Sequence, residues 1–184
     1  MHKRNIVAGV VAGMVVALDL LTKSWALEAL TPGRSAEGLG SWIPFTLAFN
    51  QGAAFGLTIG DDPRWIFVPI TILAAIFLVV LIHRARPGDH LRVVSSALVL
   101  GGALGNLYDR VRWDRGVVDF IGPVDLGFMH WPIFNLADMA ITTGAILLAI
   151  SFWTEEERED GEEAAVQEEL SAGRGSEGTV AEAG

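Results

Sequence analysis

Four long apolar segments constrain the folding of this chain more than any other feature. They cover about residues 5–25, 65–82, 91–110 and 133–153. An α-helix needs about 20 apolar residues to cross the hydrocarbon core of a bilayer, and it satisfies its own backbone hydrogen bonds there. The sequence therefore predicts an all-α membrane protein with four transmembrane helices.

The first segment resembles the start of a cleaved secretory signal peptide, because a short basic stretch, residues 1–4, precedes its apolar run. However, Asp19 and Lys23 interrupt the end of that run, and no convincing cleavage site with small residues follows. We therefore expect residues 5–25 to be retained as the first transmembrane helix.

The net charge of the chain lies after the last apolar segment. Residues 1–154 carry 11 acidic and 11 basic residues, whereas residues 155–184 carry 11 acidic residues and two arginines, so the formal net charge of −9 belongs to the tail. We expect a four-helix transmembrane domain in residues 1–154 and an acidic, disordered cytoplasmic tail in residues 155–184. A basic patch for nucleic acid is absent. The chain has no cysteine, which excludes disulfides, thiolate metal sites and a cysteine nucleophile.

Two connections between the apolar segments, residues 28–63 and 111–131, are too polar and too rich in Gly and Pro to span a membrane. Within them, residues 42–50, 116–121 and 124–129 combine aromatic and β-branched side chains. This composition predicts short strands on or near the membrane surface.

Basic residues near the ends of the apolar segments indicate the orientation, because short cytoplasmic loops are enriched in Lys and Arg. Five of them, Lys3, Arg4, Arg84, Arg86 and Arg92, lie on the side that also holds both termini. Three arginines on the opposite side, Arg110, Arg112 and Arg115, weaken the bias, but they stand close to acidic residues that suggest roles in a site. We expect both termini to be cytoplasmic.

With this topology, the polar groups inside the membrane fall at the outer ends of their helices. They are Asp19, Lys23, Asn106, Asp109, Arg110, Asn135 and Asp138. An unpaired charge at mid-bilayer costs about 2.5–3.5 kcal/mol on insertion scales, so such residues turn toward one another or toward water. The pattern predicts one polar chamber that opens to the outer leaflet.

The spacing of these residues lets each polar set face the interior of the bundle. Asp19 and Lys23 are four residues apart, which favours a structural ion pair. Asn106 and Arg110 have the same spacing, and two roles stay open for them: scaffolding of the following loop, or contact with a substrate.

Three aspartates in the region 109–138 have different surroundings. A salt bridge to Arg110 or Arg112 explains Asp109 better than a role as catalytic acid. Asp119 lies between apolar residues of a predicted strand, where burial raises the pKa of a carboxyl. Asp138 lies near the start of the fourth segment, where a helix N-terminus favours the anion and burial opposes it. Two such carboxyls can share a proton for catalysis, although ion-coupled transport also uses buried aspartates.

Glycines mark positions where other groups approach the backbone. Gly52 follows the first predicted strand, and Gly101 and Gly105 in the third segment predict close packing against a neighbouring helix. Three histidines, His83, His90 and His130, show no metal-ligand spacing, so we expect no metal site.

Five motifs occur in a fixed order along the chain. They are Asp19-x-x-x-Lys23, FNQGAAFG at residues 49–56, GGALGNLYDR at residues 101–110, VVDF at residues 117–120 and FNLAD at residues 134–138. Together with the four apolar segments, they make residues 5–153 resemble the bacterial lipoprotein signal peptidases, also called signal peptidase II. The acidic tail is not part of this resemblance.

The resemblance implies a membrane aspartic endopeptidase of the bacterial cytoplasmic (inner) membrane. It would remove signal peptides from prolipoproteins that carry a diacylglyceryl cysteine and would cleave just before that cysteine. Asp119 and Asp138 would be the catalytic pair that activates water. The residues that would bind substrate or support the pair are Asp19, Lys23, Asn50, Gly52, Asn106, Asp109, Arg110 and Asn135.

The resemblance also implies a small extracytoplasmic β-cradle and a short helix over the site. Membrane lipids and globomycin-type cyclic peptide inhibitors would be further partners. No metal, cofactor or nucleic acid is implied.

Two other classes of function stay open. A proton- or ion-coupled transporter would use the same buried aspartates, but it predicts carboxylates spread through the membrane depth rather than crowded on one side. A structural or chaperone-like protein would bind lipopeptides without cleaving them, and a cleavage assay separates it from a peptidase.

Overall fold

The computed structural model describes residues 2–38, 40–52 and 62–155. Four helices in it are long and apolar enough to cross a membrane, which confirms the fold class expected from the sequence. Three of them are α1 (His2–Ala29), α2 (Arg64–Arg84) and α3 (His90–Arg112), and the fourth, the C-terminal helix, covers Leu136–Glu155.

The chain divides into two units, Met1–Leu147 and Leu148–Gly184. The first unit holds α1, α2, α3, all the strands named below and residues 136–147 of the C-terminal helix. Of the second unit, the structure describes residues 148–155. The predicted acidic tail therefore lies outside the described residues, apart from Glu155.

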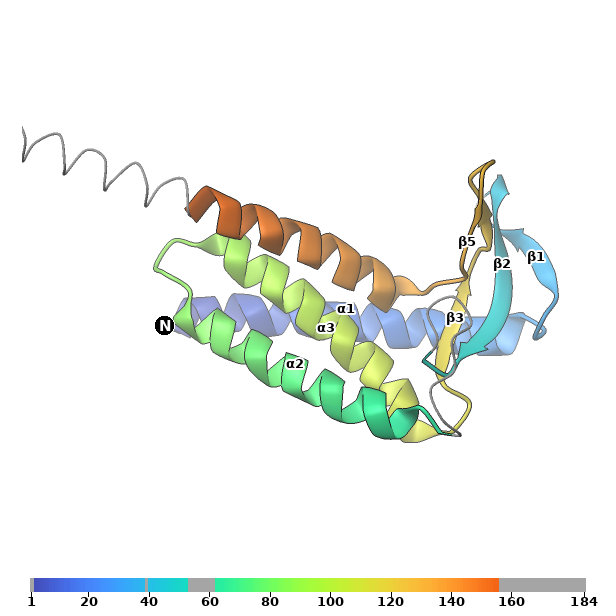
Figure 1. Ribbon diagram of the computed structural model, residues 1–184, viewed down its shortest axis with the longest axis horizontal. Coiled ribbons are helices and arrows are strands. Elements are labelled where there is room, and N and C mark those ends of the chain that lie inside the picture. Colours follow the sequence, from blue (N-terminus) through green and yellow to red (C-terminus); the bar gives the residue numbers. More distant parts are fainter. Residues whose placement is uncertain (1, 39, 53–61, 156–184) are drawn as a thin grey trace, which may run out of the picture. The chain divides into compact units, whose positions relative to one another are not determined.

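α3 is the central helix of the first unit. Half of its apolar window is buried, against 22% for α1 and 11% for α2, so α1 and α2 leave most of their apolar side chains for lipid. α3 packs against both, and Figure 1 shows the three helices side by side.

Glycines make the contact between α3 and α1 close. A Cβ at Gly101 would lie 2.8 Å from the carbonyl oxygen of Ala12, and one at Gly105 would lie 2.5 Å from a carboxylate oxygen of Asp19. Neither position has room for a side chain. The packing role that the sequence predicts for these two glycines is confirmed.

The polar connections form two small sheets at the end of the helices where α1 and α3 finish and α2 begins (Figure 1). Strands β1 (Ser35–Gly38), β2 (Gly40–Asn50) and β3 (Val117–Ile121) form an antiparallel sheet in that order, and β4 (Val124–Asp125) pairs with β5 (His130–Trp131). The sequence predicts β2 and β3 but misses β1, whose small and polar residues have no strand-like pattern. The strand predicted over residues 124–129 is wrong beyond Asp125, because a turn at Gly127, with a φ of 81°, separates β4 from β5. No short helix accompanies the four long ones in the described parts of the chain.

The C-terminal helix begins at Leu136, three residues after the start that the apolar pattern predicts. The reason is backbone pairing with β3. The N–H of Phe134 donates to the carbonyl oxygen of Ile121 at 3.0 Å, and the N–H of Ile121 donates to that of Phe134 at 2.9 Å. This pairing ties the start of the helix to β3 and so brings Asp138 toward Asp119.

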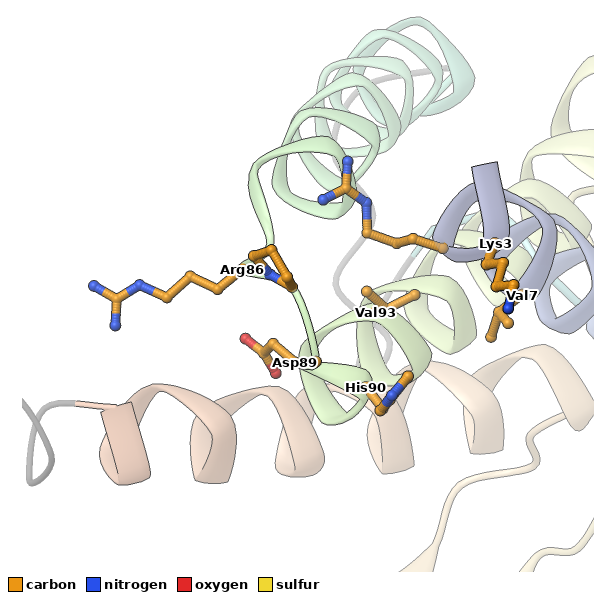
Figure 2. Close-up of a pocket in the computed structure, with 9 residues that line it drawn as sticks. Lys3, Val7, Arg86, Asp89, His90 and Val93 are labelled. Atoms are coloured by element: carbon orange, nitrogen blue, oxygen red, sulfur yellow. The ribbon is translucent and has the colours of Figure 1, made fainter. Parts of the chain in front are cut away.

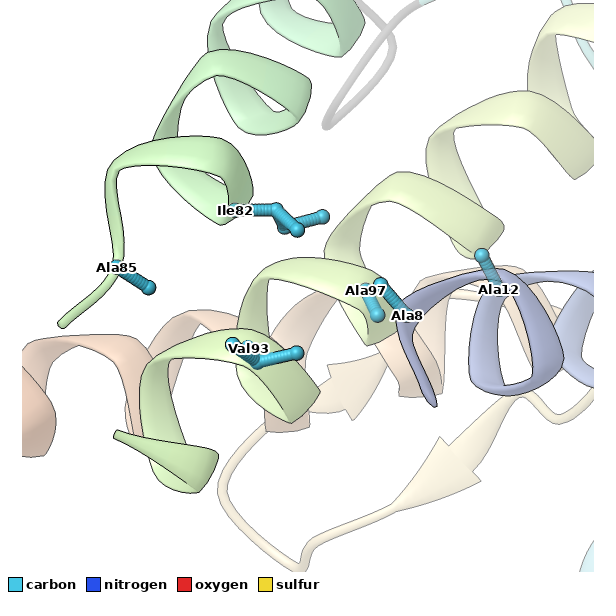
Figure 3. Packing of buried hydrophobic residues seen from close by; sticks show 6 residues of the cluster. All are labelled: Ala8, Ala12, Ile82, Ala85, Val93 and Ala97. Atoms are coloured by element: carbon cyan, nitrogen blue, oxygen red, sulfur yellow. The ribbon is translucent and has the colours of Figure 1, made fainter. Parts of the chain in front are cut away.

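At the other end of the first unit, small apolar side chains form a core. Figure 3 shows its buried members, Ala8, Ala12, Ile82, Ala85, Val93 and Ala97. Residues 5–18 of α1, 65–82 of α2 and 93–107 of α3 contain no ionisable side chain. Since 14 helical residues rise about 21 Å, a thick apolar layer separates the charges at the two ends.

Candidate active site

Asp119 is a buried carboxyl group in the middle of β3, opposite Ala48 of β2. It is only 2% exposed. Burial, together with the negative charge of Asp138, raises the pKa of Asp119 from 3.8 to about 7. The direction predicted from its apolar neighbours is confirmed. Near neutral pH this group can both give and take a proton, which general acid–base chemistry requires.

Two asparagine side chains connect Asp119 with Asp138. Asn135 Nδ2 donates to Asp119 Oδ1 at 2.7 Å and to Asn106 Oδ1 at 3.1 Å. Asn106 Nδ2 in turn donates to Asp138 Oδ1 at 2.8 Å. Asn135 and Asn106 are both buried, so this series of hydrogen bonds is shielded from solvent. The two amides hold one oxygen of each carboxyl group in place.

Asp138 lies in the first turn of the C-terminal helix and caps the N-terminal end of that helix. Its Oδ2 accepts a hydrogen bond from the backbone N–H of Asn135 at 3.2 Å, and Asn135 Oδ1 accepts one from the backbone N–H of Asp138 at 2.9 Å. This reciprocal arrangement is a capping box, which satisfies backbone donors that a helix start leaves unpaired. The same two residues therefore define the helix start and orient the site.

The ammonium group of Lys23 in α1 is surrounded by two carboxylates and the amide oxygen of Asn106. Its Nζ lies 2.7 Å from Asp19 Oδ2 and 3.0 Å from Asp109 Oδ2, and it donates to Asn106 Oδ1 at 2.9 Å. The side chain is 3% exposed. The predicted ion pair between Asp19 and Lys23 is confirmed, and this one cation also fixes which way the Asn106 amide faces.

The two carboxylates around Lys23 connect further elements. Asp19 Oδ1 accepts from the backbone N–H of Ala137 in the C-terminal helix at 3.0 Å. Asp109 Oδ2 accepts from the backbone N–H of Val118 in β3 at 3.2 Å. Residues of α1 and α3 thus hold the two elements that carry Asp138 and Asp119.

The partner of Asp109 differs from the one that the sequence suggests. The expected salt bridge to Arg110 or Arg112 is wrong, because the packing of α1 against α3 brings Lys23 to Asp109. Arg112 instead lies over the ring of Trp113, 4.4 Å from its centroid. Residues next to Asp109 along α3 point to other sides of that helix, whereas Lys23 of α1 points into the same helix–helix interface as Asp109.

Arg110 lies close to the carboxyl pair without forming an ion pair among the described residues. Its guanidinium lies over the ring of Phe67 in α2, 5.4 Å from the centroid, and its charge interacts with those of Asp138 and Asp119. Its Nε is buried without a hydrogen-bond partner in the described part of the chain. Asn106 bonds to Lys23, Asn135 and Asp138 and not to the loop that follows α3. The two roles left open for Asn106 and Arg110 stay predictions.

Asn50 ends β2 close to Asp119, and Gly52 follows it. Asn50 lies near enough to Asp119 to oppose the rise in its pKa, and Asn50 Oδ1 accepts from the backbone N–H of Gly52 at 2.9 Å. Gly52 has a φ of 121°, and a Cβ there would collide with the ring of Phe67. The rest of this motif, residues 53–56, lies outside the described residues.

The sequence does not predict the contacts that several aromatic residues make around the site. Phe67 contacts Arg110, yet nothing distinguishes it within the uniformly apolar α2. Trp25 packs edge-on against Phe45 and Phe120, with ring centroids 5.3 Å and 6.0 Å away. These rings join the end of α1 to β2 and β3, and only the tertiary contacts reveal them.

The acidic residues of the site are arranged around amides and a lysine rather than around one another. In residues 2–38, 40–52 and 62–155, no group of three or more His, Cys, Asp or Glu side chains is close enough to hold a metal ion. The arrangement suits proton transfer between two carboxyl groups and water.

Comparison with known proteins relates this site to a family. Residues 11–154 match the model of the Peptidase_A8 family, signal peptidase (SPase) II. A lipoprotein signal peptidase of Francisella tularensis subsp. novicida (strain U112) is 41% identical over 149 residues, which cover 79% of this chain and 91% of that protein. Another, from Pseudomonas aeruginosa (strain UCBPP-PA14), is 39% identical over 148 residues, which cover 76% and 83%.

Two solved structures, each described as a bacterial membrane enzyme determined by the in meso method, share the fold. The one at 1.9 Å resolution is 34% identical with a TM-score of 0.69, over 79% of this chain and 91% of that chain. The one at 2.3 Å resolution is 34% identical with a TM-score of 0.72, over 82% and 90%. The sequence and structural matches agree, and the chain belongs to the signal peptidase II family of membrane proteases.

Proposed function

We propose that this chain is an aspartic endopeptidase that removes signal peptides from diacylglyceryl-modified prolipoproteins by cleaving before the lipidated cysteine. The observation that carries the proposal is the hydrogen-bonded series Asp119–Asn135–Asn106–Asp138. It links a carboxyl group of β3, with a pKa of about 7, to a carboxyl group in the first turn of the C-terminal membrane helix. Membership of the signal peptidase II family supports the same assignment.

In the first step of the proposed reaction, Asp119 holds a proton and Asp138 is the carboxylate. Asp138 takes a proton from water as the water oxygen bonds to the scissile carbonyl carbon, and Asp119 donates its proton to the carbonyl oxygen. A neutral tetrahedral diol results. The raised pKa of Asp119 supports its role as the proton donor.

The second step breaks the peptide bond. Asp138 passes its proton to the amide nitrogen, and the carbon–nitrogen bond breaks as Asp119 takes a proton from one diol hydroxyl. The signal peptide leaves with a new carboxyl group, and the lipidated cysteine leaves with a free amino group. Both aspartates return to their initial states.

The surrounding residues divide between substrate contact and support. Arg110 has an unpartnered buried Nε and is proposed to hold the substrate backbone, together with Asn50 beside Asp119. The residues proposed to position the pair are Asp19, Lys23, Gly52, Asn106, Asp109 and Asn135.

The distribution of ionisable residues argues against an ion-coupled transporter. A proton or ion relay needs polar groups through the membrane depth. Residues 5–18, 65–82, 93–107 and 139–154 of the four helices contain no ionisable side chain. Hydrolysis at one membrane surface does not need such groups, because water reaches the site from that side.

Cleavage of a purified lipidated prolipoprotein by the purified full-length chain tests the carboxyl pair. Asp119→Asn and Asp138→Asn should each lower kcat by about 10²–10⁴-fold, the usual contribution of a general acid or base. Asp125→Asn is the matched control, since Asp125 is exposed in β4 and should leave kcat unchanged. Full activity of either pair variant would overturn the proposed mechanism.

The substrate assignment has its own test. The wild-type protein should cleave the diacylglyceryl form of a prolipoprotein and leave the unmodified form intact. A globomycin-type cyclic peptide should compete with the lipidated substrate. Equal cleavage of the unmodified form would contradict the lipid requirement while leaving the aspartic mechanism in place.

We further propose that both termini are cytoplasmic and that the carboxyl pair faces the extracytoplasmic side of the bacterial cytoplasmic membrane. The five basic residues at the ends of α1, α2 and α3 support this orientation. Because the chain has no cysteine, single cysteines can be labelled without background. In spheroplasts, an impermeant maleimide should label Glu37→Cys in β1 and should label Thr154→Cys only after lysis; the reverse pattern would contradict the proposal.

A further inference from the structure

We propose that the end of the bundle remote from Asp119 and Asp138 holds the phosphate group of an anionic phospholipid. A cavity of about 290 Å³ lies there, between the start of α1, the α2–α3 loop and the start of α3 (Figure 2). Among its lining residues are Lys3, Arg4 and Val7 of α1, Arg86 of the loop, and His90 and Val93 of α3.

The lining of this cavity has an excess of positive charge. Asp89 is its single acidic residue, and its carboxylate already accepts a hydrogen bond from the backbone N–H of Arg92 at 3.0 Å and lies 3.3 Å from Arg92 Nε. Figure 2 shows Arg86 extending away from Lys3. We therefore leave Arg86 out of the proposed site. The two basic residues of α1 that line the cavity, Lys3 and Arg4, carry the proposal.

Arg4 is held in a way that leaves part of its guanidinium available. Its Nη1 donates to the carbonyl oxygen of Ala85, at the C-terminal end of α2, at 2.6 Å. Its Nε is buried without a hydrogen-bond partner among the described residues. A guanidinium has five N–H donors in one plane, and a phosphate oxygen is the acceptor that matches its unused edge. A bound phosphate would satisfy this buried donor.

The depth of the cavity favours a lipid as the source of the phosphate. α2 has 21 residues and is about 31 Å long, close to the roughly 30 Å of the hydrocarbon core. The residues that follow Arg84 therefore lie at the level of the lipid headgroups. Basic pockets at that level between membrane helices are suited to anionic headgroups.

The walls of the cavity continue into apolar surface. Val93 belongs to the buried core of Figure 3, whereas Val7 and Val10 of α1 are 38% and 57% exposed. A lipid with its phosphate beside Lys3 and Arg4 could lay its acyl chains along this exposed side of α1. A free phosphate would leave that surface unused.

Lipid binding to the purified full-length protein tests the proposal without a peptidase assay. Native mass spectrometry can compare phosphatidylglycerol, phosphatidylcholine and inorganic phosphate as ligands. Phosphatidylglycerol should bind best, and Lys3→Gln and Arg4→Gln should each weaken it about fivefold, as expected for one basic residue at a membrane surface. Arg34→Gln removes an exposed cation that follows the opposite end of α1, and it should leave lipid binding unchanged.

Each other outcome would overturn part of the proposal. Phosphate binding that depends on Lys3 and Arg4, with no preference for phosphatidylglycerol, would replace the lipid by a free anion. Equal weakening by Arg34→Gln, or none by Lys3→Gln, would rule out the site. Lys3 is exposed, so its variant keeps the test decisive even where Arg4→Gln fails to fold.

Discussion

Asp119 and Lys23 are equally buried but have opposite properties. Asp119 faces amide donors and another carboxyl, and its pKa rises to about 7. Lys23 faces two carboxylates, 2.7 and 3.0 Å from its Nζ, which hold it in an ion-paired network. At the scale of single residues, the partners of a buried charge therefore decide whether it exchanges protons or maintains structure.

The raised pKa of Asp119 predicts a pH dependence of cleavage. A carboxyl with a pKa of about 7 keeps its proton below that pH and loses it above. If Asp119 donates the proton in the first step, kcat/KM should fall about tenfold per pH unit above pH 7. A profile from pH 5 to 9 measures this, with Asp125→Asn expected to follow the wild type. Activity that keeps rising to pH 9 would contradict the assignment.

Replacement of Lys23 should destabilise the protein. Lys23→Gln leaves the buried carboxylates of Asp19 and Asp109 without their cation, a change that typically costs about 3–5 kcal/mol. Thermal unfolding in detergent should show a clearly lower Tm. The double variant Lys23→Gln with Asp19→Asn should recover part of the loss, because one unpaired charge is removed. An unchanged Tm in the single variant would show that the network adds no net stability.

At the scale of elements, the position of the site depends on a helix–helix contact, a strand pairing and a helix cap. α3 approaches α1 through glycines, β3 pairs with the residues before the C-terminal helix, and a capping box starts that helix at Leu136. Each contact places one polar side chain beside the next. A small shift between two helices would therefore separate the carboxyl groups from their amides.

Gly105→Ala tests this dependence on close packing. The added methyl group would lie 2.5 Å from Asp19 Oδ2, so α1 and α3 would have to separate or the ion pair would have to move. Overpacking of this kind costs about 1–3 kcal/mol and should lower both Tm and kcat. Gly13→Ala is the matched control, because a Cβ at Gly13 meets nothing within 4 Å. Equal effects of the two substitutions would argue against a packing role.

At the scale of the molecule, the first unit confines its charge to the two ends of the helix bundle. The carboxyl groups, the amides and Lys23 of the proposed site lie at the end of the bundle that carries the strands, and basic residues lie at the other end, at the start of α1 and α3. Apolar residues occupy the helices between the two ends. Such an arrangement keeps charges out of the hydrocarbon core, where each is costly. The proposed hydrolysis would then take place at a surface that water can reach.

The acidic tail contributes the whole net charge of −9 but no residue of the proposed site. Removal of residues 155–184 should therefore leave kcat/KM within about twofold of the full chain, since salt at moderate concentration screens interactions between charges more than roughly 10 Å apart. The same prolipoprotein assay measures this. A large loss would assign the tail a role in substrate binding or assembly.

The sequence alone was sufficient for the features that depend on local pattern. Continuous apolar runs predicted four membrane helices, because only a self-satisfied helix backbone fits that length of lipid. Helical spacing predicted the pair Asp19–Lys23 and the packing of Gly101 and Gly105, because residues four apart share a face. The motif order brought Asp119 and Asp138 together as candidates, and apolar neighbours predicted the raised pKa of Asp119.

Only the tertiary structure decided which groups from different elements meet. Lys23 pairs with Asp109 and Asn106, which no local pattern foretells, and β1, Phe67 and the start of the C-terminal helix at Leu136 follow from contacts across the fold. The physical reason is that helix crossing and strand register set the distances between residues far apart in sequence. Local periodicity indicates which face a side chain occupies, and the packing of elements selects its partner.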